Sequence, residues 1–198
     1  MKSIRNLSIA VAALIVLAAI LIYTGAFSVA ADDPHWSVTR GVLETIRERS
    51  IASRAGDVQP PASLDDPQLI AIGAEHYAEM CTGCHLAPGM EDTEIRAGLN
   101  PRPPNLAEHG MHDGPAETFW IIKHGIKMTG MPAWGPTHDD RTIWGMVAFI
   151  KQLPGMTPAK YAELTAGSEE EESHDHAHHH DDSGSHEHEE SMPQAQRP

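Results

Sequence analysis

The chain has 198 residues, enough for one ordinary domain, and its 28 acidic residues against 14 basic ones give a net charge of −14. Binding to nucleic acid depends mainly on neutralising phosphates, so this charge argues against a nucleic-acid partner. Two cysteines are too few for a disulfide framework. The charge divides the chain into four parts: residues 1–31 carry +2, residues 32–66 carry −3, residues 67–166 carry −4 and residues 167–198 carry −9.

The N-terminal part, residues 1–31, has the pattern of a membrane anchor. Lys2 and Arg5 precede an uncharged, apolar run over residues 7–31, and a helix needs about 20 apolar residues to cross a bilayer. Basic residues stay on the cytoplasmic side, so the rest of the chain is expected outside the cytoplasm. The alternative is a signal peptide cleaved after Ala31, which leaves a soluble periplasmic protein.

Residues 32–66 have the composition of a spacer. A helix is predicted over residues 39–55, because Val42, Leu43, Ile46 and Ile51 recur near one face. This face is expected to pack on the following domain.

Residues 67–166 are predicted to form an all-α domain. Pro67 starts a helix over residues 67–80, and a second helix over residues 116–124 ends at Gly125. A third helix is predicted over residues 140–152, since Thr137 or Asp139 can cap its start and Pro154 stops it. The stretches between these helices are rich in Gly and Pro, and no strand pattern is found.

The first of these helices runs directly into the motif Cys81-Thr-Gly-Cys84-His85. A Cys-x-x-Cys-His sequence is the attachment signature of haem c: the two thiols form thioethers with one porphyrin and the histidine is offered to the iron. A zinc site would need further Cys or His partners at matching spacing, and there is no second Cys pair. A thioredoxin-like redox pair would follow a strand rather than a helix.

Three motifs in this order make residues 67–166 resemble class I c-type cytochromes of the monohaem, membrane-anchored bacterial type. They are Gly73-x-x-x-Tyr77-x-x-x-Cys81-x-x-Cys84-His85, the Gly130-Met131-Pro132 turn, and a closing helix with Trp144, Val147, Ala148, Phe149 and Ile150. The resemblance implies three or more helices wrapped around one covalent haem. It also implies that Gly73 allows the first and last helices to cross closely, and that Tyr77 packs against the last one.

The sixth iron ligand is expected to be Met131. Met131 precedes Pro132, which favours an extended backbone suited to holding a thioether over the iron. The resemblance places the ligand in this turn as well. Met128, His124 and His138 are the competing candidates.

The remaining haem contacts follow from the resemblance. Pro88 is expected to provide the carbonyl that accepts the Nδ1–H of His85, a bond that fixes the orientation of the imidazole. Pro104 and Trp134 are expected to line the haem pocket, together with Pro103, Leu106, Trp120 and Ile122.

The C-terminal part, residues 167–198, is predicted to be a disordered acidic tail, because it cannot build an apolar core. Imidazoles and carboxylates together bind Cu, Ni or Zn, so a metal role competes with a purely solubilising one. The histidines concerned are His174, His176, His178, His179, His180, His186 and His188.

Three functions are compatible with this sequence. The first is a periplasm-facing carrier of single electrons, tethered to the inner membrane and serving redox partner proteins; it is not an enzyme, since both axial positions of the iron are filled. The second is a haem sensor or peroxidase-like protein with an open sixth site. The third is a metal-homeostasis protein that uses the tail.

Overall fold

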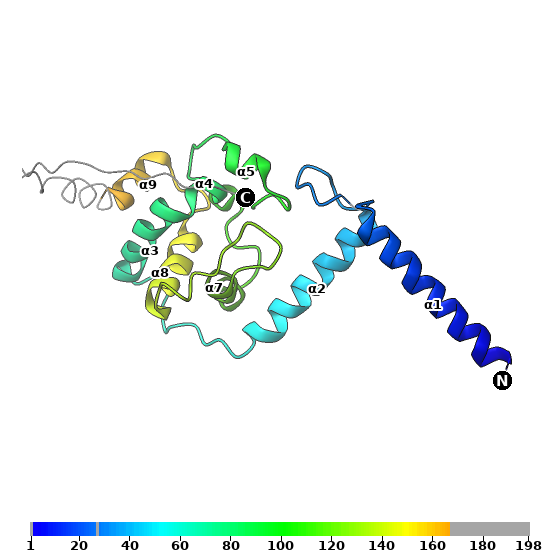
Figure 1. Ribbon diagram of the computed structural model, residues 1–198. Helices are drawn as coiled ribbons and strands as arrows, with labels where there is room; N and C mark the ends of the chain where they lie inside the picture. Colours follow the sequence, from blue (N-terminus) through cyan, green and yellow to red (C-terminus); the bar gives the residue numbers. More distant parts are fainter. Residues whose placement is uncertain (1, 27, 167–198) are drawn as a thin grey trace, which may run out of the picture.

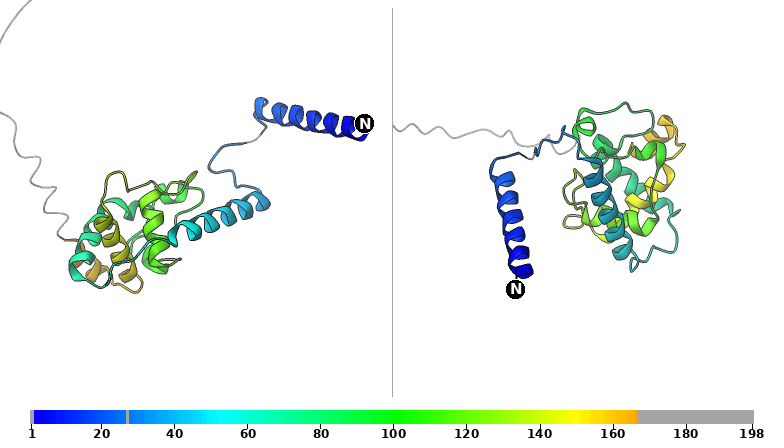
Figure 2. Two further views of the ribbon diagram at one scale, coloured as in Figure 1. Left: turned by 90° about the horizontal axis from the view of Figure 1, so that it is seen from below. Right: turned by 90° about the vertical axis from the view of Figure 1, so that its right-hand side faces the viewer.

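The computed structural model describes residues 2–26 and 28–166, and every regular element in these residues is a helix (Figure 1). The predicted all-helical class is confirmed for this part of the chain. Helices α3 to α9 gather into one body, α2 leans on its side, and α1 projects away from it (Figure 2). In chain order the helices are α1 Lys2–Tyr23, α2 Ser37–Ala55, α3 Pro67–Met80, α4 Thr82–His85, α5 Glu94–Gly98, α6 Leu106–His109, α7 Pro115–His124, α8 Asp140–Gln152 and α9 Pro158–Thr165.

The body is organised around the crossing of α3 and α8. A Cβ atom placed on Gly73 would lie 1.9 Å from the carbonyl oxygen of Gly145, so the two backbones touch with no side chain between them. One turn along α3, Tyr77 is fully buried, and its ring centroid lies 5.4 Å from that of Phe149. The expected close crossing at Gly73 and the packing of Tyr77 on the last helix are both confirmed.

Local sequence explains where these two helices begin. Pro67 occupies the first turn of α3, and the Asp66 carboxylate accepts the Gln68 N–H at 2.9 Å. The Asp139 carboxylate accepts the Thr142 N–H at 2.8 Å and so caps α8. Both helices have the predicted bounds, and α7 begins one residue earlier than predicted, at Pro115.

Three helices were not anticipated from the sequence. The short helices α5 and α6 lie within the Gly- and Pro-rich stretch that the sequence predicts to be a loop. Helix α9 follows Pro154 and packs back on the core, where the Tyr161 ring centroid lies 6.0 Å from that of Phe149. Helix α9 therefore adds to the core beside α3, although the Gly and Pro pattern of the sequence does not indicate a helix there.

Helix α1 matches the predicted membrane segment. Residues Ser3–Tyr23 are long and apolar enough to cross a membrane, and none of this stretch is buried within the structure. A signal sequence has the same length and composition, so the helix alone does not separate a retained anchor from a cleaved one.

Helix α2 packs on the body only through its C-terminal part. Ile51 and Ala55 are 5% and 1% exposed where α2 meets α7. Val42, Leu43 and Ile46, which were expected on the packing face, remain 52%, 40% and 60% exposed. The expectation is wrong for these three residues, because the N-terminal part of α2 leaves a cavity between itself and the body.

Replacing Gly73 with Ala should destabilise the domain by roughly 3 kcal/mol, because the new methyl group must push α3 and α8 apart. Urea unfolding of the haem-loaded protein, followed by far-ultraviolet circular dichroism, measures this loss.

Gly41→Ala in α2 is the matched control. A Cβ there meets nothing within 4 Å, so this variant should be neutral or slightly stabilising. Equal unfolding midpoints for the two variants would contradict the role given to the crossing.

Candidate haem site

The two cysteines and His85 lie on a helical turn that continues α3. The Cys81 N–H donates to the Tyr77 carbonyl at 3.0 Å, and the His85 N–H donates to the Cys81 carbonyl at 2.8 Å. Side chains three residues apart on such a turn are neighbours, so the two sulfur atoms are presented to one side. Two neighbouring thiols on one helical turn are the arrangement that two thioether bonds to one porphyrin require.

Tyr77 fixes the end of this turn. Leu86 has a φ of 63°, so the chain reverses directly after His85. The Tyr77 hydroxyl donates to the Leu86 carbonyl at 2.7 Å, and burial raises the pKa of Tyr77 above its ordinary value, which keeps the hydroxyl a donor. The α3–α8 core is thereby bonded to the residue next to the predicted iron ligand.

His85 is oriented by a carbonyl from a distant part of the chain. Its Nδ1–H donates to the carbonyl of Pro104 at 3.0 Å, which leaves Nε2 available for a metal. Burial lowers the pKa of His85, although the bond to Pro104 opposes this. The imidazole is therefore neutral near pH 7, the form that binds iron.

The role predicted for Pro88 is wrong, because Pro104 provides this carbonyl. Pro88 lies in a local turn closed by the bond from the Met90 N–H to the Ala87 carbonyl at 3.0 Å. The chain must instead travel 19 residues from His85 before it returns over the imidazole. Pro104 was expected only to line the pocket.

Residues 93–104, here called the His85 wall, contain only the short helix α5 and are held mainly by bonds from side chains. The Thr93 hydroxyl donates to the carbonyl of Gly83 within the haem motif. The Arg96 Nε–H donates to the Pro103 carbonyl at 3.0 Å, and Asp92 binds both Arg96 and Arg102. These bonds fix the backbone on which the Pro104 carbonyl depends.

Residues 125–134, here called the Met131 loop, carry the predicted sixth ligand. Gly125 has a φ of 64°, and a Cβ there would lie 2.7 to 2.8 Å from backbone atoms of residues 131–133. The Ile126 N–H donates to the Met131 carbonyl at 3.2 Å, and the Met131 N–H donates to the Thr129 hydroxyl at 3.1 Å. Met131 is half-buried and packs against the core.

The competing ligand candidates are placed differently. Met128 lies in the same loop with a φ of 61° and is 87% exposed. His124 is exposed beside Trp120, at 4.9 Å between ring centroids. The ring of His138 contacts the Thr137 hydroxyl at 2.9 Å and lies 5.3 Å from the ring of His76. Met131 is thus the candidate that is turned toward the core.

The two segments meet at Leu99 and Gly130. A Cβ on Gly130 would lie 2.7 Å from a Leu99 methyl group, so the His85 wall touches the Met131 loop here. Two thiols on one turn, a neutral imidazole with a free Nε2 and a thioether on the Met131 loop are together a donor set that fits haem c. The chemistry of the residues present therefore fits this cofactor.

The other predicted pocket residues fall around these two segments. Trp134 is half-buried at the end of the Met131 loop, and its backbone N–H donates to the Ile122 carbonyl at 3.1 Å. Leu106 and Ile122 pack in the core, and Pro103 belongs to the His85 wall. The seven histidines of the tail lie outside the described residues, within which no cluster of three or more potential metal ligands occurs.

Comparison with known proteins identifies this part of the chain. Residues 68–150 match the family described as cytochrome c oxidase, cbb3-type, subunit III. Residues 68–150 are a class I cytochrome c domain. The described fold, with its α3–α8 crossing and its attachment turn, is that of this class, and haem c is the cofactor of such a domain.

Two curated relatives share this cytochrome domain. The chain is 32% identical over 94 residues to the cbb3-type cytochrome c oxidase subunit FixP of Rhizobium meliloti (strain 1021), and 31% identical over 94 residues to FixP of Sinorhizobium medicae (strain WSM419). Each match covers 45% of this chain and 29% of the relative, so the chain spans less than a third of the relatives' length.

A solved structure of the reducing HAO-like protein complex Kustc0457/Kustc0458 from Kuenenia stuttgartiensis is also similar. The match has a TM-score of 0.39 and 19% identity, and it covers 48% of this chain and 50% of the other.

Tyr77→Phe should destabilise the cytochrome domain by about 1 to 2 kcal/mol, because the Leu86 carbonyl loses a buried donor. Thermal unfolding of the haem-loaded variant measures this effect.

Tyr161→Phe removes a hydroxyl from the same core as a control. The Tyr161 hydroxyl is buried without a hydrogen-bond partner among the described residues, so its loss should be neutral or stabilising. A Tyr161 variant that loses as much stability as the Tyr77 variant would refute the role given to the hydrogen bond from Tyr77 to Leu86.

Proposed function

We propose that the protein carries single electrons through one covalent haem c, with His85 and Met131 as axial ligands. The observation that carries this proposal is the bond from His85 Nδ1–H to the Pro104 carbonyl at 3.0 Å, which leaves Nε2 as the ring nitrogen available to a metal. Cys81 and Cys84 would attach the porphyrin, and Met131 would provide the second axial ligand from the Met131 loop.

A filled sixth position would distinguish a carrier from an enzyme. When bound, the haem would supply an iron that cycles between Fe(III) and Fe(II). If His85 and Met131 both bound this iron, no site on it would remain for a substrate, and the methionine would raise the reduction potential. The chain contributes orientation through Pro104, exclusion of water through its core, and a stiff loop for Met131.

The location that fits this function is the outer face of the cytoplasmic membrane. Lys2 and Arg5 lie in the first turns of α1, ahead of its apolar part, and basic residues stay on the cytoplasmic side, which supports a haem domain in the periplasm. The relatives are named as subunits of cbb3-type cytochrome c oxidase, which supports redox proteins of the same membrane as donor and acceptor.

Met131→Ala and Met128→Ala test the ligand assignment directly. Oxidised protein with His/Met ligation shows a weak near-infrared sulfur-to-iron band. This band should be present in the wild type and in Met128→Ala and absent in Met131→Ala, because only Met131 packs toward the core.

A high-spin spectrum in the wild type that neither variant alters would mean an open sixth site. That result would replace the carrier with the sensor or peroxidase-like protein. Rapid binding of carbon monoxide by the reduced wild type would point the same way.

The tail adds a separate metal-binding property to this proposal. Seven histidines and ten acidic residues within residues 167–198 are a suitable ligand set for Cu(II), Ni(II) or Zn(II).

Deleting residues 168–198 should abolish Cu(II) binding in calorimetric titrations at neutral pH while leaving the haem spectrum unchanged. Binding by the full chain should weaken as pH falls through about 6.5, where imidazoles become protonated. If the shortened protein takes up as much metal as the full chain, the tail has no metal role.

A further inference from the structure

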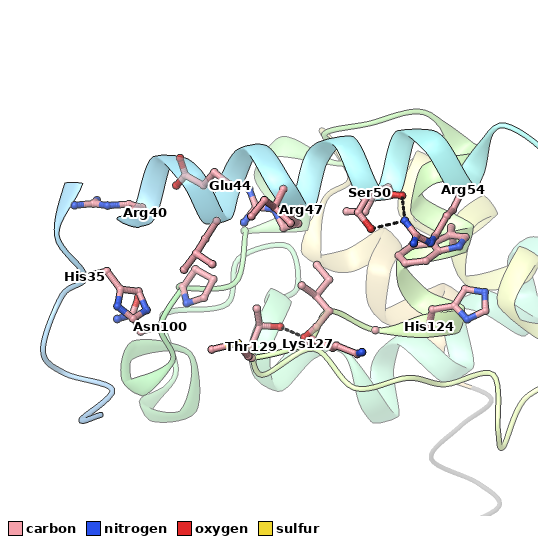
Figure 3. A pocket seen from close by; sticks show the side chains of 18 of the residues that line it. His35, Arg40, Glu44, Arg47, Ser50, Arg54, Asn100, His124, Lys127 and Thr129 are labelled. Atoms are coloured by element: carbon pink, nitrogen blue, oxygen red, sulfur yellow. Dashed lines mark hydrogen bonds between the residues drawn. The ribbon is translucent and has the colours of Figure 1, made fainter. Parts of the chain in front are cut away.

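A cavity of about 620 Å³ lies between α2 and the cytochrome body (Figure 3). One wall is the face of α2 between Arg40 and Arg54. The opposite wall consists of Asn100, Pro101 and residues 125–129, with Trp120 and His124 at one end. The cavity thus separates the N-terminal half of α2 from the body on which its C-terminal end packs.

The lining is cationic in a body that is otherwise acidic. Arg40, Arg47 and Arg54 recur every seven residues and so share one side of α2, and Lys127 adds a fourth positive charge from the body. Glu44 is the one carboxylate that lines the cavity.

These cations are poorly neutralised by the protein itself. Within the described residues Arg40 and Lys127 make no ion pair. Arg47 approaches Glu48 at 3.9 Å, and Arg54 donates to the Ser50 hydroxyl at 2.8 Å. Arg40, Arg54 and Lys127 are exposed, so water can solvate them. Four cations and one carboxylate around an apolar lining nevertheless make a positive field that favours an anionic occupant with an apolar body.

The cavity also adjoins both segments that hold the haem. Asn100 and Pro101 belong to the His85 wall, a few residues before Pro104. Residues 125–129 belong to the Met131 loop, and Ile126 is bonded to Met131 through its backbone. A haem c has thioether bonds on one edge and two carboxylates, the propionates, on the opposite edge. Attachment at Cys81 and Cys84 therefore directs the propionates away from the attachment turn.

We propose that α2 closes the propionate edge of the haem and that Arg47 provides its principal counter-charge. This inference rests on the haem of the proposed function and goes beyond it, because α2 lies outside the matched residues 68–150. Arg47 lies midway along the cationic row and its side chain is 35% exposed. Leu43, Ile46 and Trp120 cover the same edge with apolar surface and lower the local dielectric.

Arg47→Gln in the full-length, haem-loaded protein tests this inference by spectroelectrochemical titration. A positive charge beside the haem favours the reduced iron, so its removal should shift the Fe(II)/Fe(III) ratio at fixed potential about threefold to tenfold toward Fe(III). A tenfold shift corresponds to 59 mV for a one-electron couple. Arg47→Lys keeps the charge and should retain most of the wild-type ratio.

Arg49→Gln is the matched control. It removes the same charge from the same helix, but Arg49 is exposed, does not line the cavity and lies about 200° around α2 from Arg47. Its ratio should stay within about 1.5-fold of the wild type. Equal shifts for Arg47→Gln and Arg49→Gln, or no shift for either, would overturn the proposal.

Two readouts on the same samples separate the possible failures. The near-infrared band reports ligation: its absence from the wild type would defeat His/Met ligation, whereas its presence with unchanged potentials would defeat the role of α2 alone. Phospholipid that copurifies with the wild type but not with Arg47→Gln, at equal potentials, would assign the cavity to an anionic lipid and also overturn the inference.

Discussion

The contact between two glycines is the constraint on which the rest of the domain depends. Because Gly73 and Gly145 leave no side chain between α3 and α8, the helices approach closely enough for Tyr77 to reach both Phe149 and the chain beyond the haem motif. A wider crossing would separate Tyr77 from Phe149 and loosen the packing that holds the Tyr77 side chain in place. The position of His85 is thus set by backbone packing in the core, one helical turn and one hydrogen bond away.

The His85 wall and the Met131 loop are made rigid in a different way. Neither the His85 wall nor the Met131 loop contains a long helix, and each is held by side chains bonded to backbone groups, such as Arg96 to Pro103 and Met131 to Thr129. Such loops can approach a flat cofactor from opposite sides, which parallel helix axes could not do as closely. An irregular segment fixed at several points combines this access with stiffness.

Local signals in the sequence were sufficient for helices α3, α7 and α8 and for the attachment turn, but not for α5, α6 and α9. Pro67, Asp139 and Pro154 act on their own neighbours, and the Cys81 to His85 motif contains its chemistry within five residues. Contacts between distant residues were not predictable in this way. The choice of Pro104 over Pro88 depends on how 19 residues of loop return to the imidazole. Gly145 was missed too, although a glycine inside an apolar helix was a usable signal for a close approach.

The prediction of how α2 packs was partly wrong for a related reason. Its apolar residues fit a packing face, but a periodic pattern does not say how far a helix follows the surface beside it. Ile51 and Ala55 reach the body, whereas Leu43 and Ile46 border a cavity. The arginines of α2 gave no signal for a site in the sequence, because a charged helix face usually points to water.

The segment between α1 and α2 determines how the haem domain would search for a partner. Thirteen residues separate Tyr23 from Ser37, which at full extension is about 45 Å of chain and as a flexible coil about 20 Å. With α1 embedded in a bilayer, the cytochrome is confined to a shell of that depth above the lipid surface. A partner in the same bilayer then meets it at an effective concentration that can reach the millimolar range. Under such confinement, a weak and quickly released docking contact is enough for electron transfer, and fast release favours rapid turnover.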